Sequence, residues 1–178
     1  MDIFLAILGL VLPILAVLLD DVASGRIPER HHSHHDTYTV PVEYTHAFLD
    51  AALVMGILGL MVAFLCFVGV FRVTVRVVLT FTDTFVVTIL VLWGILRNYK
   101  VSVFDDHMVV TKPFKRIVSV EYANIERMEW HGFRRSSGYR NLYIWAGGRH
   151  VCTLWCMLDL EQILMRVDRF DALQPTLG

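Results

Sequence analysis

Three long apolar segments separated by polar ones occupy the first half of the chain. They run over residues 3–19, 46–71 and 77–96, and no Lys or Arg interrupts them. Apolar segments of about 17 to 25 residues are long enough to cross the hydrocarbon of a bilayer as helices. The pattern predicts a transmembrane region at 1–96 with three helices, and a polar, histidine-rich loop at 20–45 between the first two.

The third apolar segment is rich in Val and Thr, which favour strands in water. A strand pair turning near Asp83 is therefore an alternative to a helix at 77–96. The length of about 20 residues, Trp93 near the end and Arg97 directly after it match a spanning helix with an interfacial aromatic anchor. We favour the helix.

Small residues recur at a spacing of four in the second apolar segment. Ala52 and Gly56 form one such pair, and Gly59 and Ala63 form another. This spacing lets helix backbones approach closely in lipid, so it predicts helix–helix packing there.

From Tyr99 onward the hydrophobic period changes to two, which is typical of strands. Gly147 and Gly148 have the positions of a two-residue hairpin turn. Apolar residues from Leu160 to Leu173 then return at helical spacing, with Asp159 as a possible N-cap. The second half is predicted to hold six or seven short antiparallel strands followed by one amphipathic helix.

The stretch NYKVSVFDDHMVVTKPFKRIVSVEYANIERM resembles the pleckstrin-homology-like (PH-like) domains that follow membrane helices in bacterial proteins. In that family a Y-x-x-I phrase leads into the fourth strand, and here Tyr122 and Ile125 occupy it. The resemblance covers residues 97 to about 173. It implies a PH-like antiparallel β-barrel or sandwich at 97–178 with a C-terminal capping helix, an interaction or assembly role, and no catalytic residue.

Eukaryotic members of the family bind inositol phosphates through basic residues in the turn between the first two strands. This chain has Asp105, Asp106 and His107 in that turn, so the resemblance does not extend to phosphoinositide binding.

Charge is distributed unevenly along the chain. Residues 1–96 carry 4 Lys/Arg against 8 Asp/Glu, and residues 97–178 carry 12 against 9. Neither half is basic enough to indicate nucleic acid. Two positive charges, Arg72 and Arg76, flank one side of the predicted spans, and seven flank the other: Arg26, Arg30, Arg97, Lys100, Lys112, Lys115 and Arg116. The positive-inside rule then predicts a multi-pass cell-membrane protein with its N-terminus outside and its C-terminal domain cytoplasmic.

Two features are candidates for chemistry in the first half. His31, His32, His34 and His35 offer imidazole ligands for zinc, nickel or copper, or a pH-sensitive contact, although a flexible loop sets no geometry. Asp83 is an ionisable residue inside a predicted span, where such groups are rare and often functional. It is predicted either to relay protons or ions or to hold helices together as a protonated or hydrogen-bonded acid.

The second half offers cationic residues for contact with anionic headgroups or an acidic partner. They are Lys112, Lys115, Arg116, Arg134, Arg135, Arg140 and Arg149. Cys152 and Cys156 form a single C-x3-C pair, which is more typical of small buried residues than of a zinc site.

No motif for a serine hydrolase, a P-loop or a dinucleotide site occurs in the chain. The sequence therefore predicts a non-enzymatic, membrane-tethered interaction or assembly module without a cofactor, acting as a homo-oligomer or as an accessory subunit of a membrane complex. The join at Arg97–Asn98 is so short that the domain is expected to stay at a fixed height and orientation against the bilayer. The alternatives are a small transporter or channel subunit using Asp83, and a metal- or pH-responsive protein using the histidine loop.

Overall fold

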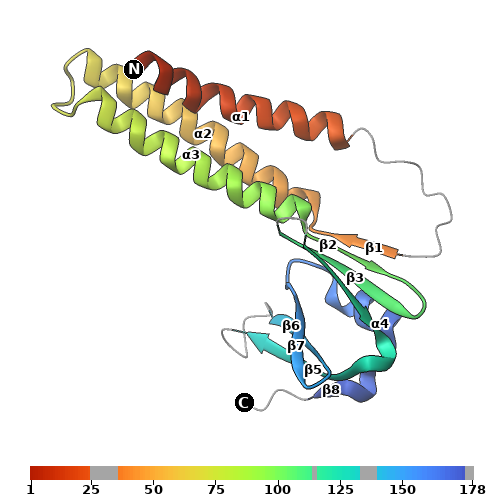
Figure 1. Cartoon of the computed structure of the whole chain (residues 1–178). Helices are drawn as coiled ribbons and strands as arrows, with labels where there is room; N and C mark the ends of the chain where they lie inside the picture. Colours follow the sequence, from red (N-terminus) through yellow and green to blue (C-terminus); the bar gives the residue numbers. More distant parts are fainter. Residues whose placement is uncertain (25–35, 114–115, 133–139, 175–178) are drawn as a thin grey trace. The chain divides into compact units, whose positions relative to one another are not determined.

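Three long helices form the first half of the protein. The structure is a computed structural model, and it describes residues 1–24, 36–113, 116–132 and 140–174. The helices are α1 (Asp2–Ser24), α2 (Val42–Phe67) and α3 (Val75–Asn98), and each is long and apolar enough to cross a membrane (Figure 1). The three predicted helices are thus confirmed, and the strand-pair alternative for residues 77–96 is wrong.

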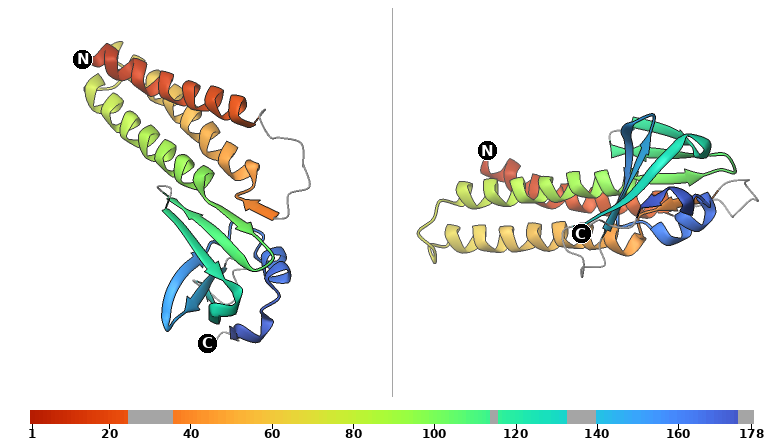
Figure 2. Two further views of the ribbon diagram at one scale, coloured as in Figure 1. Left: turned by 45° about the vertical axis from the view of Figure 1, so that its right-hand side comes forward. Right: turned by 90° about the horizontal axis from the view of Figure 1, so that it is seen from below.

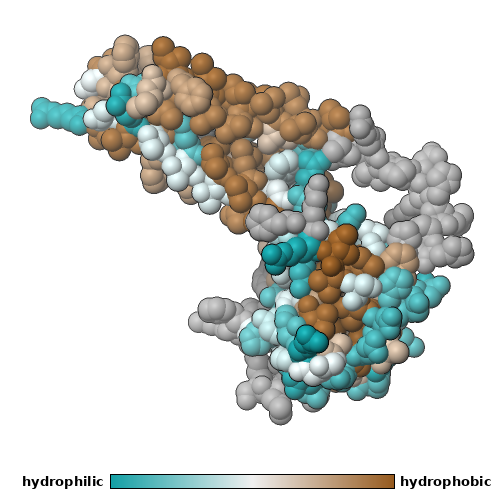
Figure 3. Space-filling view, viewed as in Figure 1, coloured by the Kyte–Doolittle hydropathy of each residue, from teal (hydrophilic) through white to brown (hydrophobic). Residues whose placement is uncertain are grey.

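The helices run side by side, as the two views of Figure 2 agree. The predicted small residues of α2, from Ala52 to Ala63, are buried against the other helices. Large apolar side chains point the other way: Phe4, Phe64 and Phe81 are 65%, 63% and 67% exposed. On the face shown in Figure 3 the surface of the helices is mostly hydrophobic, with a few hydrophilic and intermediate patches. An apolar outer face of this kind is what helices present to lipid.

Eight strands form two sheets in the described residues, and neither sheet closes into a barrel. The first sheet has the order β1 (Asp36–Thr39), β2 (Lys100–Val103), β3 (His107–Lys112) and β4 (Arg116–Glu121), all antiparallel. The second has the order β7 (Arg149–Leu154), β6 (Arg140–Ala146), β5 (Ile125–Gly132) and β8 (Leu173–Gln174), and β8 pairs with β5 in parallel. Both sheets contribute side chains to one apolar core.

Strand β1 corrects the prediction of a polar loop over residues 20–45. Helix α1 continues to Ser24, β1 occupies Asp36–Thr39, and α2 begins at Val42. Val40 is 5% exposed in the core of the two sheets, and Tyr38 packs against that core. Tyr38 and Val40 alternate with threonines, and this alternation turns one face of β1 toward the core. The strand forms because it pairs with the edge of β2.

The region predicted as one C-terminal helix consists of several shorter elements. Asp159 is the N-cap of α4 (Leu160–Val167), because its carboxylate accepts a hydrogen bond from the N–H of Gln162 at 3.1 Å. The expected helical run to Leu173 is wrong. Asp168 adopts a left-handed conformation with φ of 50°, which ends the helix, and a 3-10 turn (Phe170–Ala172) leads into β8.

The predicted glycine turn is confirmed. Gly147 and Gly148 have φ of 61° and 70° and connect β6 to β7. A two-residue turn with positive φ at both positions matches the twist of the strands that it joins.

The chain divides into two compact units. One contains the three long helices, and the other contains β1 and the chain from Leu96 onward. The second unit therefore takes a strand from the segment between α1 and α2 as well as everything after α3. We call it the β-domain.

Candidate functional site

The strand register gathers three positive charges at one end of the first sheet. Lys100, the first residue of β2, lies opposite Thr111, and the next residue of β3, Lys112, lies opposite Arg116 of β4. We call Lys100, Lys112 and Arg116 the basic end. It adjoins the point where the chain leaves α3, because only Tyr99 separates that helix from β2.

Tyr99 fastens this point to the core of the β-domain. Its side chain is 1% exposed, and its ring stacks on Trp155 with centroids 4.4 Å apart. The hydroxyl donates to the carbonyl of Thr153 at 3.0 Å and accepts from the N–H of Trp155 at 3.3 Å. Burial raises the pKa of Tyr99, so the hydroxyl stays protonated and the link between β2 and the end of β7 is independent of pH near neutrality.

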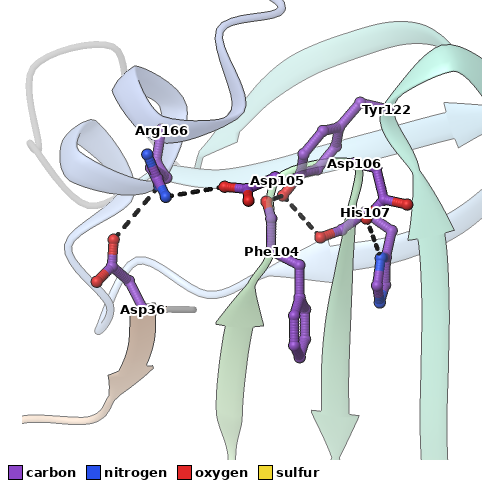
Figure 4. Close-up of polar contacts among 7 residues, drawn as sticks. All are labelled: Asp36, Phe104, Asp105, Asp106, His107, Tyr122 and Arg166. Carbon is purple, nitrogen blue, oxygen red and sulfur yellow. Dashed lines mark hydrogen bonds and ion pairs between the residues drawn. The ribbon is translucent and has the colours of Figure 1, made fainter. Parts of the chain in front are cut away.

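The opposite end of the β2–β3 hairpin is acidic. Asp105 and Asp106 form the turn, and a hydrogen bond from His107 lowers the pKa of Asp106. The hydroxyl of Tyr122 is the donor to the carbonyl oxygens of Phe104 and His107, each at 2.8 Å, and so connects both sides of the turn (Figure 4). Burial raises the pKa of Tyr122 to about 12. Charge is therefore separated along the first sheet, basic at the α3 end and acidic at the other.

Arg166 of α4 connects this acidic turn to β1. Its guanidinium lies 3.1 Å from a carboxylate oxygen of Asp105 and 3.4 Å from one of Asp36, so it bridges the two carboxylates (Figure 4). All three side chains are about half exposed or more, and exposed ion pairs contribute little to stability. They connect the start of β1 and the β2–β3 turn to α4.

The structure brings together only some of the cationic residues that the sequence singled out. The Lys112 ammonium donates to the carbonyl of Val151 at 3.1 Å, which places it beside the start of β7, where Arg149 is exposed. Arg116 is exposed opposite it. Arg140 is the first residue of β6, and Arg149 lies opposite the last residue of that strand. At 3.4 Å per residue the two ends of β6 are about 20 Å apart, so Arg140 is not part of this group. Lys115, Arg134 and Arg135 lie outside the described residues. Lys100 was counted in the sequence only as a charge flanking the predicted spans, and the strand register places it at the same end of the sheet as Lys112 and Arg116.

The outer face of the second sheet carries a row of stacked rings that the sequence analysis missed. The guanidinium of Arg127 lies 4.5 Å from the ring centre of Trp145, which meets His150 edge-on at 5.7 Å. Tyr143 stacks on His131 at 4.8 Å and contacts His150 at 5.1 Å. We call these five residues the aromatic ladder. Alternation along β5 and β6 was the available signal, since outward positions on paired strands are neighbours.

A second polar site lies inside the helical unit, around Asp83. Its side chain is 7% exposed, and neither carboxyl oxygen has a hydrogen-bond partner among the described residues. A Cβ added to Gly9 of α1 would lie 2.6 Å from a carboxyl oxygen of Asp83. A Cβ on Gly59 of α2 would lie 2.3 Å from Thr82. Glycines on two helices therefore make the room that Thr82 and Asp83 occupy.

Polar side-chain contacts between helices mark both ends of this bundle. Asp2 of α1 pairs with Arg76 of α3 at 3.0 Å, and Asp20 of α1 pairs with His46 of α2 at 3.0 Å. Asp20 is 6% exposed, although it is the first residue of the predicted polar loop at 20–45. Its partner is distant in sequence, so periodicity alone gave no signal for it.

The predicted metal ligands are not brought into a site that the structure describes. His31, His32, His34 and His35 lie outside the described residues, and within those residues no three His, Cys, Asp or Glu side chains are placed to hold a metal ion. Cys152 is fully buried, and burial raises the pKa of its thiol to about 11. It packs in the core, where a neutral thiol behaves as a small apolar side chain.

Comparison of the chain with protein-family models, with curated proteins and with solved structures gave no match.

The glycine contacts predict a contrast between two positions in the helices. A Cβ on Gly56 would lie 2.5 Å from the carbonyl oxygen of Gly9, whereas a Cβ on Gly94 would meet no atom within 4 Å. Gly56→Ala is expected to destabilise the bundle by about 1–3 kcal/mol through overpacking. Gly94→Ala is expected to leave stability unchanged or raise it by up to about 1 kcal/mol, since alanine favours helix. Thermal unfolding in one detergent, followed by circular dichroism, compares them, and equal midpoints for the two variants would contradict this packing.

Proposed function

We propose that the protein is a membrane-tethered, non-enzymatic binding module whose β-domain, of the PH-like type, docks at the cytoplasmic face of the cell membrane. The basic end contacts anionic lipid headgroups. The aromatic ladder binds a protein partner, which is another copy of the chain or a subunit of a larger membrane complex.

The register of the first sheet carries this proposal. Lys100, Lys112 and Arg116 share the end of the sheet that follows α3. Two residues of chain reach about 7 Å at most, so Lys100 cannot lie far from the end of α3 at Asn98. Trp93 and Arg97 are the residue types that anchor a helix end at the headgroups. Each positive charge near an anionic surface contributes about 1 kcal/mol.

The pairing of β1 with β2 supports the arrangement of the helices across the bilayer. These strands are adjacent in one sheet, with Thr39 opposite Lys100. The chain before α2 and the chain after α3 must then lie on the same side of the membrane. Two crossings, by α2 and α3, satisfy this requirement, and the positive-inside rule assigns that side to the cytoplasm.

The composition of the aromatic ladder supports protein binding. Trp, Tyr and Arg are the residues most often found at the energetic centre of protein interfaces. Here Arg127, Tyr143 and Trp145 already contact neighbouring rings or charges on a sheet, so little side-chain freedom is lost on binding.

Lipid binding is tested in nanodiscs that contain the full-length protein in phosphatidylcholine with added phosphatidylserine. Lys100→Gln with Arg116→Gln removes two exposed charges and is expected to weaken phosphatidylserine retention by about 2 kcal/mol, or roughly thirtyfold. Lys112 is left intact because it also bonds to Val151. Native mass spectrometry measures the lipid retained during a titration.

The matched control is Arg127→Gln with Arg140→Gln, which removes the same charge elsewhere on the β-domain. Retention close to that of the wild type is expected for this control. If both double variants lose lipid equally, net charge explains the binding and the basic end has no special role.

Partner binding is tested by the size of the complex extracted in mild detergent. Trp145→Ala is expected to dissociate it at least tenfold more readily, since truncating a central interface tryptophan costs about 2 kcal/mol or more. Phe170→Ala is the control, because Phe170 is 51% exposed and lies outside the ladder. Light scattering and cross-linking in cells report the complex. A wild-type protein that is monomeric and cross-links to nothing would overturn the partner role.

A further inference from the structure

Two contacts between α1 and α3 show how deep Asp83 lies in the helical unit. Asp2 pairs with Arg76, and Gly9 faces Asp83. Gly9 comes seven residues after Asp2, and Asp83 comes seven after Arg76. Seven residues are about two turns, or about 10 Å, so α1 and α3 run parallel and keep the same register over this distance. The carboxyl therefore lies about two turns inside the bundle, away from its charged end.

No charged group faces Asp83 from any of the three helices. On α1 no titratable residue lies between Asp2 and Asp20, and on α3 Asp83 is the only one between Arg76 and Arg97. Between Asp50 of α2 and Arg72, which follows the end of that helix, the Cys66 thiol is the only titratable group. The nearest base along α3, Arg76, is about 10 Å away and already pairs with Asp2. The carboxyl has no counter-ion within its own level of the helical unit.

The carboxyl group of Asp83 is buried as well as lacking a counter-ion. Both oxygens are buried without a hydrogen-bond partner among the described residues. Thr84 and Thr88 lie on the exposed side of α3, and their hydroxyls donate to backbone carbonyls of the helix at 2.8 Å. An ionised carboxylate in such surroundings is strongly disfavoured, whereas a neutral acid needs a partner for one proton only.

We propose that Asp83 is an intramembrane proton-binding site. The neutral acid packs against the backbone of α1 at Gly9, where a glycine leaves room for one carboxyl oxygen and none for a water shell. Release of the proton leaves a carboxylate that needs water, and admitting water requires α1 and α3 to separate. Proton binding at Asp83 and close packing of α1 on α3 are thereby coupled. The inference goes beyond the docking function and uses only the helical unit.

The test uses dicyclohexylcarbodiimide, an apolar reagent that reacts with protonated carboxyl groups, on the full-length protein in nanodiscs. Mass spectrometry of the digested protein locates the label. We expect Asp83 to be labelled at pH 7 at least tenfold faster than the exposed Asp50, and the rate to fall about tenfold per pH unit once the acid is mostly ionised. Asp83→Asn is expected to lose this label, and Asp50→Asn to keep it.

A second measurement covers the case in which the reagent cannot enter. The infrared difference spectrum between the wild type and Asp83→Asn is expected to show the carbonyl band of one protonated carboxylic acid at pH 7, where surface carboxylates are ionised. Absence of that band together with absence of label at Asp83 would overturn the proposal. Protection of Asp83 by sodium at constant pH would also overturn it, because it would identify a metal-cation site. A monomeric protein or one that binds no anionic lipid would leave this result unaffected, so the two proposals fail separately.

Discussion

The pairing of β1 with β2 is the constraint on which the arrangement of this protein depends. Two segments more than 60 residues apart, one before α2 and one after α3, lie side by side in one sheet, with Thr37 and Ser102 in contact at 3.1 Å. The β-domain is thus connected to the helices at two adjacent points by one or two residues each.

Charge and burial are organised around that junction. Positive residues gather at one end of the first sheet and the acidic turn lies at the other end, where Arg166 contacts both Asp105 of the turn and Asp36 of β1. Within the helices the opposite condition holds, because the outer faces are apolar and Asp83 is packed against glycine with no counter-ion at its level. Both patterns follow from the cost of removing charge from water. An exposed ion keeps its water, whereas burying an ionised group without a partner costs much free energy.

Periodicity predicted most of the elements, and tertiary contacts account for what it missed. The three helices, the alternation after Tyr99, the Gly147–Gly148 turn and the Asp159 cap all depend on nearby residues, so the pattern was sufficient. Strand β1 is four residues long and exists because β2 offers an edge, which no local pattern reveals. Helix α4 is shorter than its apolar spacing implies, because Asp168 turns left-handed and the later apolar residues pack from a 3-10 turn and β8. Asp83 was identifiable from its type and position, but Gly9 as its neighbour was not.

Disulfide trapping of the β1–β2 pair tests the central claim most directly. Cysteines replacing Thr37 and Ser102 lie directly opposite one another, at a separation that a disulfide can bridge. Mild oxidation of the full-length protein in membranes is predicted to link T37C to S102C, so that the fragments on either side of a cleavage between α2 and α3 stay joined until reduced. Neither single-cysteine variant is expected to give this product. Fragments that separate without reductant, while T37C and S102C each remain reactive to thiol reagents, would show that the two segments do not share a sheet.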